Sequence, residues 1–476
     1  MNRVAGRSPK IVKLKVANYP YFRNLMKPIF DFRRFPYLPF PSVPWIAGGY
    51  LLLLLSLPFA VDLPQGSLAL EVPSEPLQIL LVGRRLPLLC QWRHHHATLW
   101  KAPLLRISGL WLLWMLLTIP GSSAPLVSAK YGLVALTHWY LFAYLPLLIG
   151  WQLPQLLPRW FNLYTFPLLL LLLYAWSVHA QYDFRIDASV LVARPFFFDH
   201  ALLSTALLLV LGPYLYALHR RRGRWHYAYP VVLLLLLGVY LSYSRAAWIS
   251  ALLALGLTGT LVLFRHYFRW MLGLTGLGLL GLALLLPSLW AGILQNRVES
   301  KKGNWWQQMA SVANVTTDVS NLERLNRYRC AWRMVGDRPW RGFGAGTYAL
   351  AYLPYQKPEE MTRISVTEVG PHPPGRGGGA HSEYFQALAE LGWPGGLLFL
   401  ALVLTSLFTA GRVYWSAARD SHRYLALALG FGLLTFFIHA LFNNFFHHSK
   451  IAMLIWSSMA ILIQLEREAA DDRTIA

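Results

Sequence analysis

Long apolar runs recur along nearly the whole chain, and they constrain its fold more than any other feature of the sequence. Of the 476 residues, 56% are hydrophobic and only 13% are charged, which is about half the charged fraction of an average soluble domain. A soluble protein of this composition could not cover its surface with polar groups. The sequence therefore excludes a cytosolic or secreted globular enzyme and predicts an all-α polytopic membrane protein.

Twelve apolar segments are predicted to be transmembrane helices, because a bilayer core needs about 20 helical residues. Two of them, 77–92 and 230–243, are short. The first also carries Arg84 and Arg85 near its middle, which leaves a re-entrant or interfacial helix open there. The predicted spans are 43–61, 77–92, 104–120, 131–150, 161–179, 199–219, 230–243, 248–264, 270–290, 394–411, 424–442 and 450–465.

The distribution of basic residues predicts the orientation of these helices, since cytoplasmic loops are enriched in Lys and Arg. With the N-terminus in the cytoplasm, the arm, the tail and the inner short loops carry 23 Lys and Arg residues, and the outer short loops carry four. Both termini are therefore predicted to be cytoplasmic. The net charge of +22 follows from this topology and requires no nucleic acid partner.

The chain is predicted to have five parts. A basic cytoplasmic arm (1–42) precedes nine spans (43–290), and the arm either lies on anionic lipid headgroups or serves only to set topology. A large periplasmic loop (291–393) then precedes three spans (394–465) and a cytoplasmic tail (466–476). Apolar residues at helical spacing over 321–336 predict that the large loop is a small helical subdomain.

Several motifs argue against metal or nucleotide chemistry. Cys90 and Cys330 form no Cys-x-x-Cys pair, and their predicted locations on opposite sides of the membrane exclude a disulfide between them. The histidines at 94–96 and 447–448 are interpreted as parts of solvated loops rather than as metal sites. The Gly-rich segment 342–346 lacks the Gly-Lys-Ser/Thr ending of a P-loop and predicts a turn. The chain contains no Asp-x-Asp, the commonest metal-binding motif of nucleotide-sugar transferases.

Three cations on the predicted outer side are candidates for binding. Lys130, Arg194 and Arg245 each lie where an outer loop meets a helix and are flanked by small or hydroxyl residues. Ionisable residues at membrane depth are costly and mark functional sites. The alternative interpretation is that these side chains extend to lipid phosphates.

His381 is the strongest candidate for catalysis. It follows a run of glycines and precedes Ser382, which is predicted to cap a helix that ends at Gly392, with Pro394 opening the next span. The positive end of the helix dipole disfavours a charged imidazole, and a neutral imidazole can act as a general base. The alternative is a histidine that only hydrogen-bonds the loop.

These segments together resemble the O-antigen ligase and O-antigen polymerase superfamily of bacterial inner-membrane glycosyltransferases. Residues 380–396 resemble its signature, in which His is followed by Glu, Leu and Gly, although Ser382 stands where many members have Asn. The remaining matches cover parts of residues 100–465. Segments 125–130 and 194–196 resemble the ligase branch most. The full set of remaining matches is 125–130, 244–245, 321–325, 337–344 and 194–196.

The resemblance implies an inverting, metal-independent enzyme without a cofactor, which acts at the periplasmic face of the inner membrane. The donor it implies is a glycan on undecaprenyl diphosphate, and the acceptor is the lipid A core or a second lipid-linked glycan. By position, His381 matches the essential histidine, and Arg194 and Arg245 match the arginines near the diphosphate. Lys130 is a further candidate for that site, and the supporting residues are expected to be Glu383, Arg324, His200 and Tyr384.

A transporter or flippase of lipids or glycans is the alternative from another functional class. Twelve helices and intramembrane arginines also fit such a protein. It predicts internal repeats, which the sequence does not show, and it gives no role to a large outer loop that bears a helix-capped histidine.

Overall fold

The computed structural model describes residues 42–65, 68–83, 99–148, 153–220, 227–263, 319–368 and 378–475. The chain divides into two compact units, residues 1–52 and 53–476. The first unit is described only from Ser42, where helix α2 (Ser42–Ser56) begins. The predicted basic arm thus lies outside the described residues, as do the predicted span 270–290, most of residues 84–98 with Cys90 and His94–His96, and the first part of the large loop.

The protein is an all-α polytopic membrane protein. Among the described residues, eight helices are long and apolar enough to cross a membrane, and two shorter apolar helices, Gly48–Phe59 and Ala228–Leu241, accompany them. Each of these ten helices overlaps a predicted span, so ten predictions of apolar helices are confirmed. The eight long helices are Pro103–Gly121, Pro125–Leu148, Trp160–Ala180, His200–Arg220, Arg245–Leu263, Glu383–Ser416, Asp420–His439 and Ser449–Asp472.

The helix boundaries differ from the predicted ones in two informative places. α7 (Pro125–Trp139) begins before Lys130 and continues through a π-helical turn, η4 (Tyr140–Tyr144), into α8 (Leu145–Leu148). Lys130 therefore lies within a helix and not at its start. α19 (Ser449–Ile475) continues through the predicted tail, where residues 466–470 are good helix formers.

The region predicted as a simple outer loop at 62–76 is the clearest error in the predicted fold. Strands β1 (Val61–Gln65) and β2 (Leu68–Val72) form an antiparallel hairpin there, with Val61 opposite Val72. Helix α3 (Ser74–Gly83) follows and is only ten residues long, so its described part is too short to span a bilayer. Pro64 within the hairpin obscured the alternating pattern that indicates a strand.

Helices far apart in the sequence pack tightly because glycine allows their backbones to approach. α10 (His200–Arg220) packs on α18 (Asp420–His439), α11 (Ala228–Leu241) and α12 (Arg245–Leu263). At the first crossing, a Cβ on Gly212 would lie 2.3 Å from the carbonyl oxygen of Ala428. α19 packs against α7, α9 (Leu153–Ala180), α10, α17 and α18, and its apolar window is almost entirely buried.

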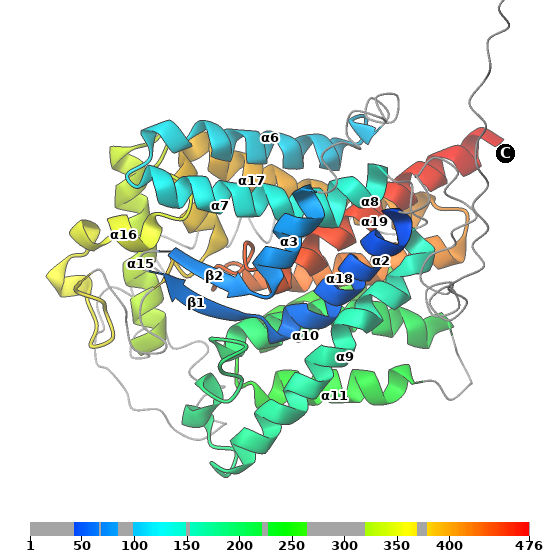
Figure 1. Cartoon of the computed structure of the whole chain (residues 1–476), viewed down its shortest axis with the longest axis horizontal. Helices are drawn as coiled ribbons and strands as arrows, with labels where there is room; N and C mark the ends of the chain where they lie inside the picture. Colours follow the sequence, from blue (N-terminus) through cyan, green and yellow to red (C-terminus); the bar gives the residue numbers. More distant parts are fainter. Residues whose placement is uncertain are drawn as a thin grey trace, which may run out of the picture. The chain divides into compact units, whose positions relative to one another are not determined.

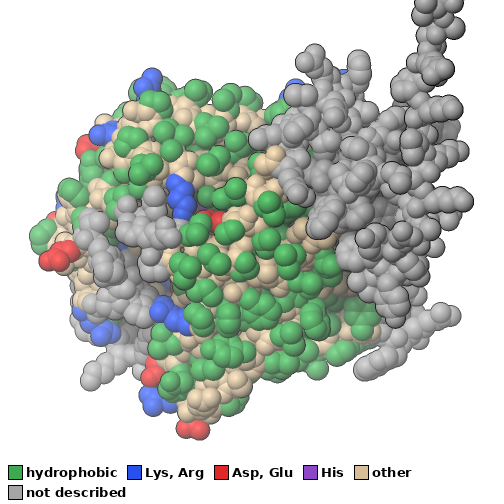
Figure 2. All heavy atoms as spheres, in the orientation of Figure 1, with side chains coloured by type: hydrophobic (Ala, Val, Ile, Leu, Met, Phe, Trp, Pro, Cys, Tyr) green, Lys and Arg blue, Asp and Glu red, His purple; other side chains and the backbone are tan. Residues whose placement is uncertain are grey.

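The outer surface of these helices is strongly apolar. Figure 2 shows a face on which hydrophobic side chains predominate and charged side chains are few. Large aliphatic residues such as Leu233, Leu252 and Leu263 are more than half exposed. Side chains of this kind are stable in lipid and costly in water, as a membrane-embedded surface requires.

The described part of the large loop contains several helices, and the helix predicted over 321–336 is confirmed. Its main helix is α15 (Val319–Asp337), which contains the predicted helix 321–336. The short helices α16 (Tyr348–Ala351), η7 (Leu353–Tyr355) and η8 (Pro358–Glu360) follow. Its core is formed by Cys330, Ala331, Met334, Phe343, Tyr348, Tyr352, Val366, Ala380 and Ala389. Cys330 is free and buried.

α17 (Glu383–Ser416) connects this subdomain to the membrane helices. It packs on α15, on α6 (Pro103–Leu117) and on α18, and Figure 1 shows α6, α7 and α17 running alongside one another. The helix is broken at Gly392, whose φ of 67° is left-handed. The predicted end of one helix at Gly392 and start of the next at Pro394 are therefore confirmed. Short 3-10 helices complete the described chain at η2 (Leu57–Phe59), η3 (Ile119–Gly121) and η5 (Ile186–Val190).

Candidate active site

His381 lies in a tight turn directly before α17. Its own φ is 55°, a left-handed conformation that is uncommon for residues other than glycine. Ser382 follows in an extended conformation and accepts a hydrogen bond from the backbone N–H of Phe385 at 3.5 Å. The predicted N-cap is thus confirmed. A non-glycine residue that holds such a conformation is typical of functional sites.

The turn is held from several directions. The Tyr328 hydroxyl donates to the carbonyl oxygens of both His381 (3.1 Å) and Leu441 (2.7 Å), and its ring stacks on Phe385. A Cβ on Gly379 would lie 2.1 Å from Gln386 Oε1 and 2.2 Å from Asn444 Nδ2, so a side chain there would displace both amide groups. The turn therefore joins α15, α17 and the segment between α18 and α19.

The surroundings of His381 favour its neutral form. The imidazole is partly buried, and loss of hydration is the largest cause that lowers its pKa well below the usual 6.5. The guanidinium groups of Arg327 and Arg324 lower this pKa further. The sequence predicted a neutral imidazole from the helix dipole; in the structure, burial and the two arginines favour it.

The residues expected to support the site have different roles in the structure. Arg324 is partly buried and donates from Nε to the carbonyl oxygen of Phe442 at 3.3 Å. Glu383 is buried and accepts from the backbone N–H of Phe446, while Tyr384 donates to the carbonyl oxygen of Phe437 at 3.1 Å. These three side chains fix the segments around His381. Glu383 was expected to orient the imidazole or the acceptor sugar, but its hydrogen bond in the structure is to the backbone.

Arg194 and Arg245 lie at the same end of the helices that follow them. Arg194 precedes α10, and Arg245 is the first residue of α12, which packs beside α10. The connections at this end also touch, because the Tyr243 hydroxyl donates to the carbonyl oxygen of Phe184 at 3.3 Å. Both arginines are partly exposed. Their convergence on a single cavity stays a prediction.

Arg194 has capacity to bind a further group. One of its Nη atoms donates to the carbonyl oxygen of Phe198 at 3.0 Å. Its Nε is buried and has no hydrogen-bond partner among the described residues. A buried donor of this kind normally finds a partner, so the geometry of Arg194 is suited to binding an anionic group.

The segment between α18 and α19 links the arginine end to His381. The ring of Phe198, four residues after Arg194, contacts the rings of Phe445 and His448 at centroid distances of 6.0 and 5.7 Å. The neighbouring Asn444 abuts Gly379 in the turn that carries His381. His381 and Arg194 are therefore connected through three short segments that are distant in the sequence.

Lys130 and His200 are already engaged by other side chains. Lys130 forms an ion pair with Glu75 of α3 at 3.7 Å, and burial of Glu75 raises the pKa of its carboxyl despite this cation. His200 Nδ1 lies 3.0 Å from the Ser189 hydroxyl, and its Nε2 lies 3.6 Å from Asp199. Compared with Arg194, these two side chains have less capacity for a ligand.

His447 and His448 do not lie in a solvated loop, so that prediction is wrong. The ring of His447 contacts Trp111 and Tyr131, and His448 Nδ1 lies 4.0 Å from Glu71 Oε1. Burial lowers the pKa of both histidines to about 3. The error has a physical reason, because the hairpin and the α3 segment that cover this turn were not predicted. Among the described residues, no cluster of three or more His, Cys, Asp or Glu could hold a metal ion.

Sequence reasoning missed two buried charged residues near the site. The Glu390 carboxylate accepts from the backbone N–H groups of Gly346 and Tyr348, both at 2.9 Å. Lys450 donates to the carbonyl oxygens of Ala60, at 2.7 Å, and Phe196. Glu390 was detectable as a carboxylate on the face of α17 that also carries Glu383 and Ala387. Lys450 follows a segment that was predicted as an outer loop, and no local sequence pattern indicated that its side chain is buried.

The sequence of this region was compared with families of known proteins. Residues 230–400 match the model of the family described as O-antigen ligase. This match supports the resemblance of the chain to the O-antigen ligase and polymerase superfamily. The matched part includes Arg245, Arg324 and His381, whereas Lys130 and Arg194 precede it. A comparison with curated proteins finds no significant match.

The match supports an enzyme of the membrane glycosyltransferase type that acts in O-antigen ligation or polymerisation. It also implies lipid-linked glycans as substrates.

Proposed function

We propose that the protein transfers a glycan from undecaprenyl diphosphate to a sugar of the lipid A core. The reaction takes place at the periplasmic face of the inner membrane, inverts the anomeric centre and needs no metal. The observation that carries this proposal is the partly exposed imidazole of His381, which a left-handed turn holds beside two guanidinium groups within the segment that matches the O-antigen ligase family.

In the proposed reaction, a hydroxyl oxygen of the acceptor sugar attacks the anomeric carbon of the donor glycan. The bond from that carbon to the diphosphate oxygen breaks, and undecaprenyl diphosphate leaves with the bonding electrons. His381 takes the proton from the attacking hydroxyl, a contribution worth about 10²–10⁴ in rate. The diphosphate is a good leaving group and needs no general acid.

Arg194 and Arg245 are proposed to bind the departing diphosphate. Guanidinium groups bind phosphate oxygens through paired hydrogen bonds, and fixed positive charges stabilise the charge that develops as the bond breaks. The Arg194 Nε without a partner among the described residues supports this role. Because Lys130 is paired with Glu75, any contribution it makes to the diphosphate site requires exchange of that ion pair.

The glycans of a strain that lacks the protein test the substrate assignment. We expect lipid A core without polymer, together with accumulated long glycans on undecaprenyl diphosphate. Core capped by a single repeat would instead identify a polymerase that uses the same donor. Unchanged glycans in the deletion strain would contradict both assignments.

A further inference from the structure

A buried ion pair on α15 lies directly behind the turn that carries His381. Arg327 Nε donates to Glu323 Oε1 at 3.0 Å, one helical turn away. Only 1% of Arg327 and 3% of Glu323 is exposed. Desolvation makes such a pair a weak source of stability, and apolar residues of similar size could replace it. Its presence therefore calls for another explanation.

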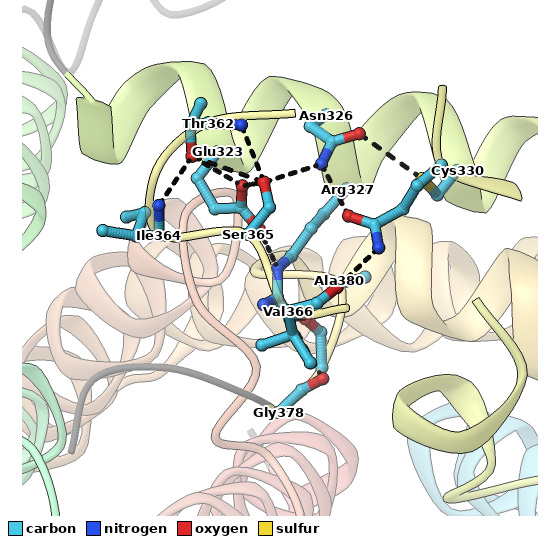
Figure 3. A network of polar contacts seen from close by, with 12 residues as sticks. Glu323, Asn326, Arg327, Cys330, Thr362, Ile364, Ser365, Val366, Gly378 and Ala380 are labelled. Atoms are coloured by element: carbon cyan, nitrogen blue, oxygen red, sulfur yellow. Dashed lines mark hydrogen bonds and ion pairs between the residues drawn. The ribbon is translucent and has the colours of Figure 1, made fainter. Parts of the chain in front are cut away.

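Arg327 also binds the backbone that leads into the His381 turn. Arg327 Nη1 donates to the carbonyl oxygens of Gly378 and Gly379, at 3.1 and 2.9 Å. Figure 3 shows the Arg327 side chain extending from α15 toward Gly378. These two glycines come immediately before Ala380 and His381, so the guanidinium holds the backbone from which the imidazole turn begins.

The carboxylate of the pair is also fixed by hydrogen bonds. Glu323 Oε2 accepts hydrogen bonds from the hydroxyls of Thr362, at 3.0 Å, and Ser365, and both contacts are visible in Figure 3. The ring of Tyr352 lies 5.0 Å from the Arg327 guanidinium. Contacts on several sides fix the guanidinium, since a side chain with several charge-assisted hydrogen bonds has little freedom to move.

We propose that Arg327, fixed by Glu323, is a positioning residue for His381. Its guanidinium holds the carbonyl groups of Gly378 and Gly379 and so presents the imidazole to the acceptor in the left-handed turn before α17. This inference rests on the proposed role of His381 as the general base. Gln386 completes the arrangement from α17, because its side-chain oxygen accepts from the Ala380 N–H at 3.2 Å.

The charge of Arg327 gives the proposal a second consequence. The titratable or charged groups of α15 around the turn are Glu323, Arg324, Arg327 and Tyr328. On α17, the Glu383 carboxylate accepts from a backbone N–H. The two guanidiniums oppose protonation of the imidazole. Loss of Arg327 is therefore expected to raise the pKa of His381, whereas a lysine at this position would retain the charge and lose the geometry.

Two substitutions separate geometry from charge in the full-length purified protein. Arg327→Lys should reduce kcat by about 10–100-fold, since a displaced base is costly, while KM and the acid limb of the pH profile change little. Arg327→Gln should reduce kcat similarly and move the acid limb upward by about one pH unit. The matched control is Arg333→Gln on the same helix, because Arg333 pairs with Glu360 at 2.6 Å and does not contact the turn. This control should retain the kcat and the acid limb of the wild type.

A chemical readout makes the test independent of glycan transfer. Diethyl pyrocarbonate modifies an imidazole only in its neutral form. The extent of modification at His381 itself, measured by mass spectrometry over a range of pH, therefore reports the pKa of His381. The midpoint should rise in Arg327→Gln and should stay near that of the wild type in Arg327→Lys and Arg333→Gln.

Each outcome bears on one proposal. Wild-type kcat and an unmoved acid limb in both Arg327 variants would overturn the positioning role. Failure of both variants to fold would also overturn it, because the pair would then serve stability alone. If the wild type transfers no glycan, the proposed function fails, and the modification profiles still decide whether Arg327 controls the state of His381.

Discussion

At the residue scale, the position of His381 determines what its imidazole can do. A histidine in water is half protonated near pH 6.5. In this turn, burial and the charges of Arg327 and Arg324 lower its pKa well below that value. The side chain is thus a proton acceptor over the whole physiological range, and it remains partly exposed to a substrate.

The pH dependence of turnover should follow from this shift. Because the pKa of His381 lies below 6.5, the base is already deprotonated at pH 6.5, and kcat should be flat through that value. Activity should fall only at lower pH, as protonation removes the base. Turnover of the purified protein between pH 4.5 and 8 would be measured. An acid limb centred at or above pH 6.5 would contradict the assignment.

Arginine geometry should matter at the diphosphate site as much as charge. Arg245→Lys should lower kcat/KM by about tenfold or more, because an ammonium cannot form the paired hydrogen bonds of a guanidinium. Arg185→Lys provides a control, since Arg185 pairs with Asp187 in an exposed loop at 2.9 Å and should tolerate lysine. Equal kcat/KM values in the two variants would show that Arg245 does not bind the diphosphate.

Metal removal gives a separate prediction for the same site. If the arginines alone stabilise the leaving diphosphate, EDTA should leave the transfer rate unchanged. The rate would be measured with and without chelator and after addition of Mg²⁺. A rate that depends fully on added Mg²⁺ would show that the arginines do not suffice.

At the element scale, α17 illustrates which features the sequence predicted well. The N-cap at Ser382, the break at Gly392 and the restart at Pro394 each depend on one residue with a strong local preference, and all were predicted. The partners of the break were not predictable, because they are distant in the sequence. The N–H of Trp393 donates to the carbonyl oxygen of Pro339, and a Cβ on Gly392 would lie 2.5 Å from the carbonyl oxygen of Trp340.

Substitution of this glycine should therefore destabilise the protein. Gly392→Ala introduces both a left-handed alanine and a backbone clash, and it should lower the free energy of unfolding by about 1–3 kcal/mol. Gly256→Ala in α12 is the control, since no atom lies within 4 Å of the added Cβ. Thermal unfolding in detergent would compare the two variants. An unfolding midpoint of Gly392→Ala equal to that of the control would mean that the kink is not required.

At the scale of the whole molecule, composition and hydropathy predicted the class of fold, because apolar helices in a bilayer depend on local sequence. Ten predicted spans are helices, and the helical subdomain of the large loop was also anticipated. The hairpin at 61–72, the ion pair of Glu323 and Arg327 and the buried Lys450 were not. Each of these depends on contacts between segments far apart in the sequence, which no local pattern encodes.

The orientation of the protein in the membrane is predicted from its basic residues and can be tested directly. In a background without native cysteines, Lys357→Cys in the subdomain should react with an impermeant maleimide added from the periplasmic side. Ala418→Cys, in the predicted cytoplasmic loop 412–423, should be protected. Both positions are exposed, so access depends on the side of the membrane. Reversed labelling would invert the topology and move His381 away from a periplasmic substrate.

The central claim is that His381 is the base of a glycan transfer reaction, and one measurement tests it most directly. Purified wild-type protein and His381→Ala would be compared for transfer of glycan from undecaprenyl diphosphate to lipid A core acceptor, after unfolding curves show that both are folded. The variant should be slower by about 10²–10⁴-fold. Turnover of His381→Ala close to that of the wild type would contradict the account.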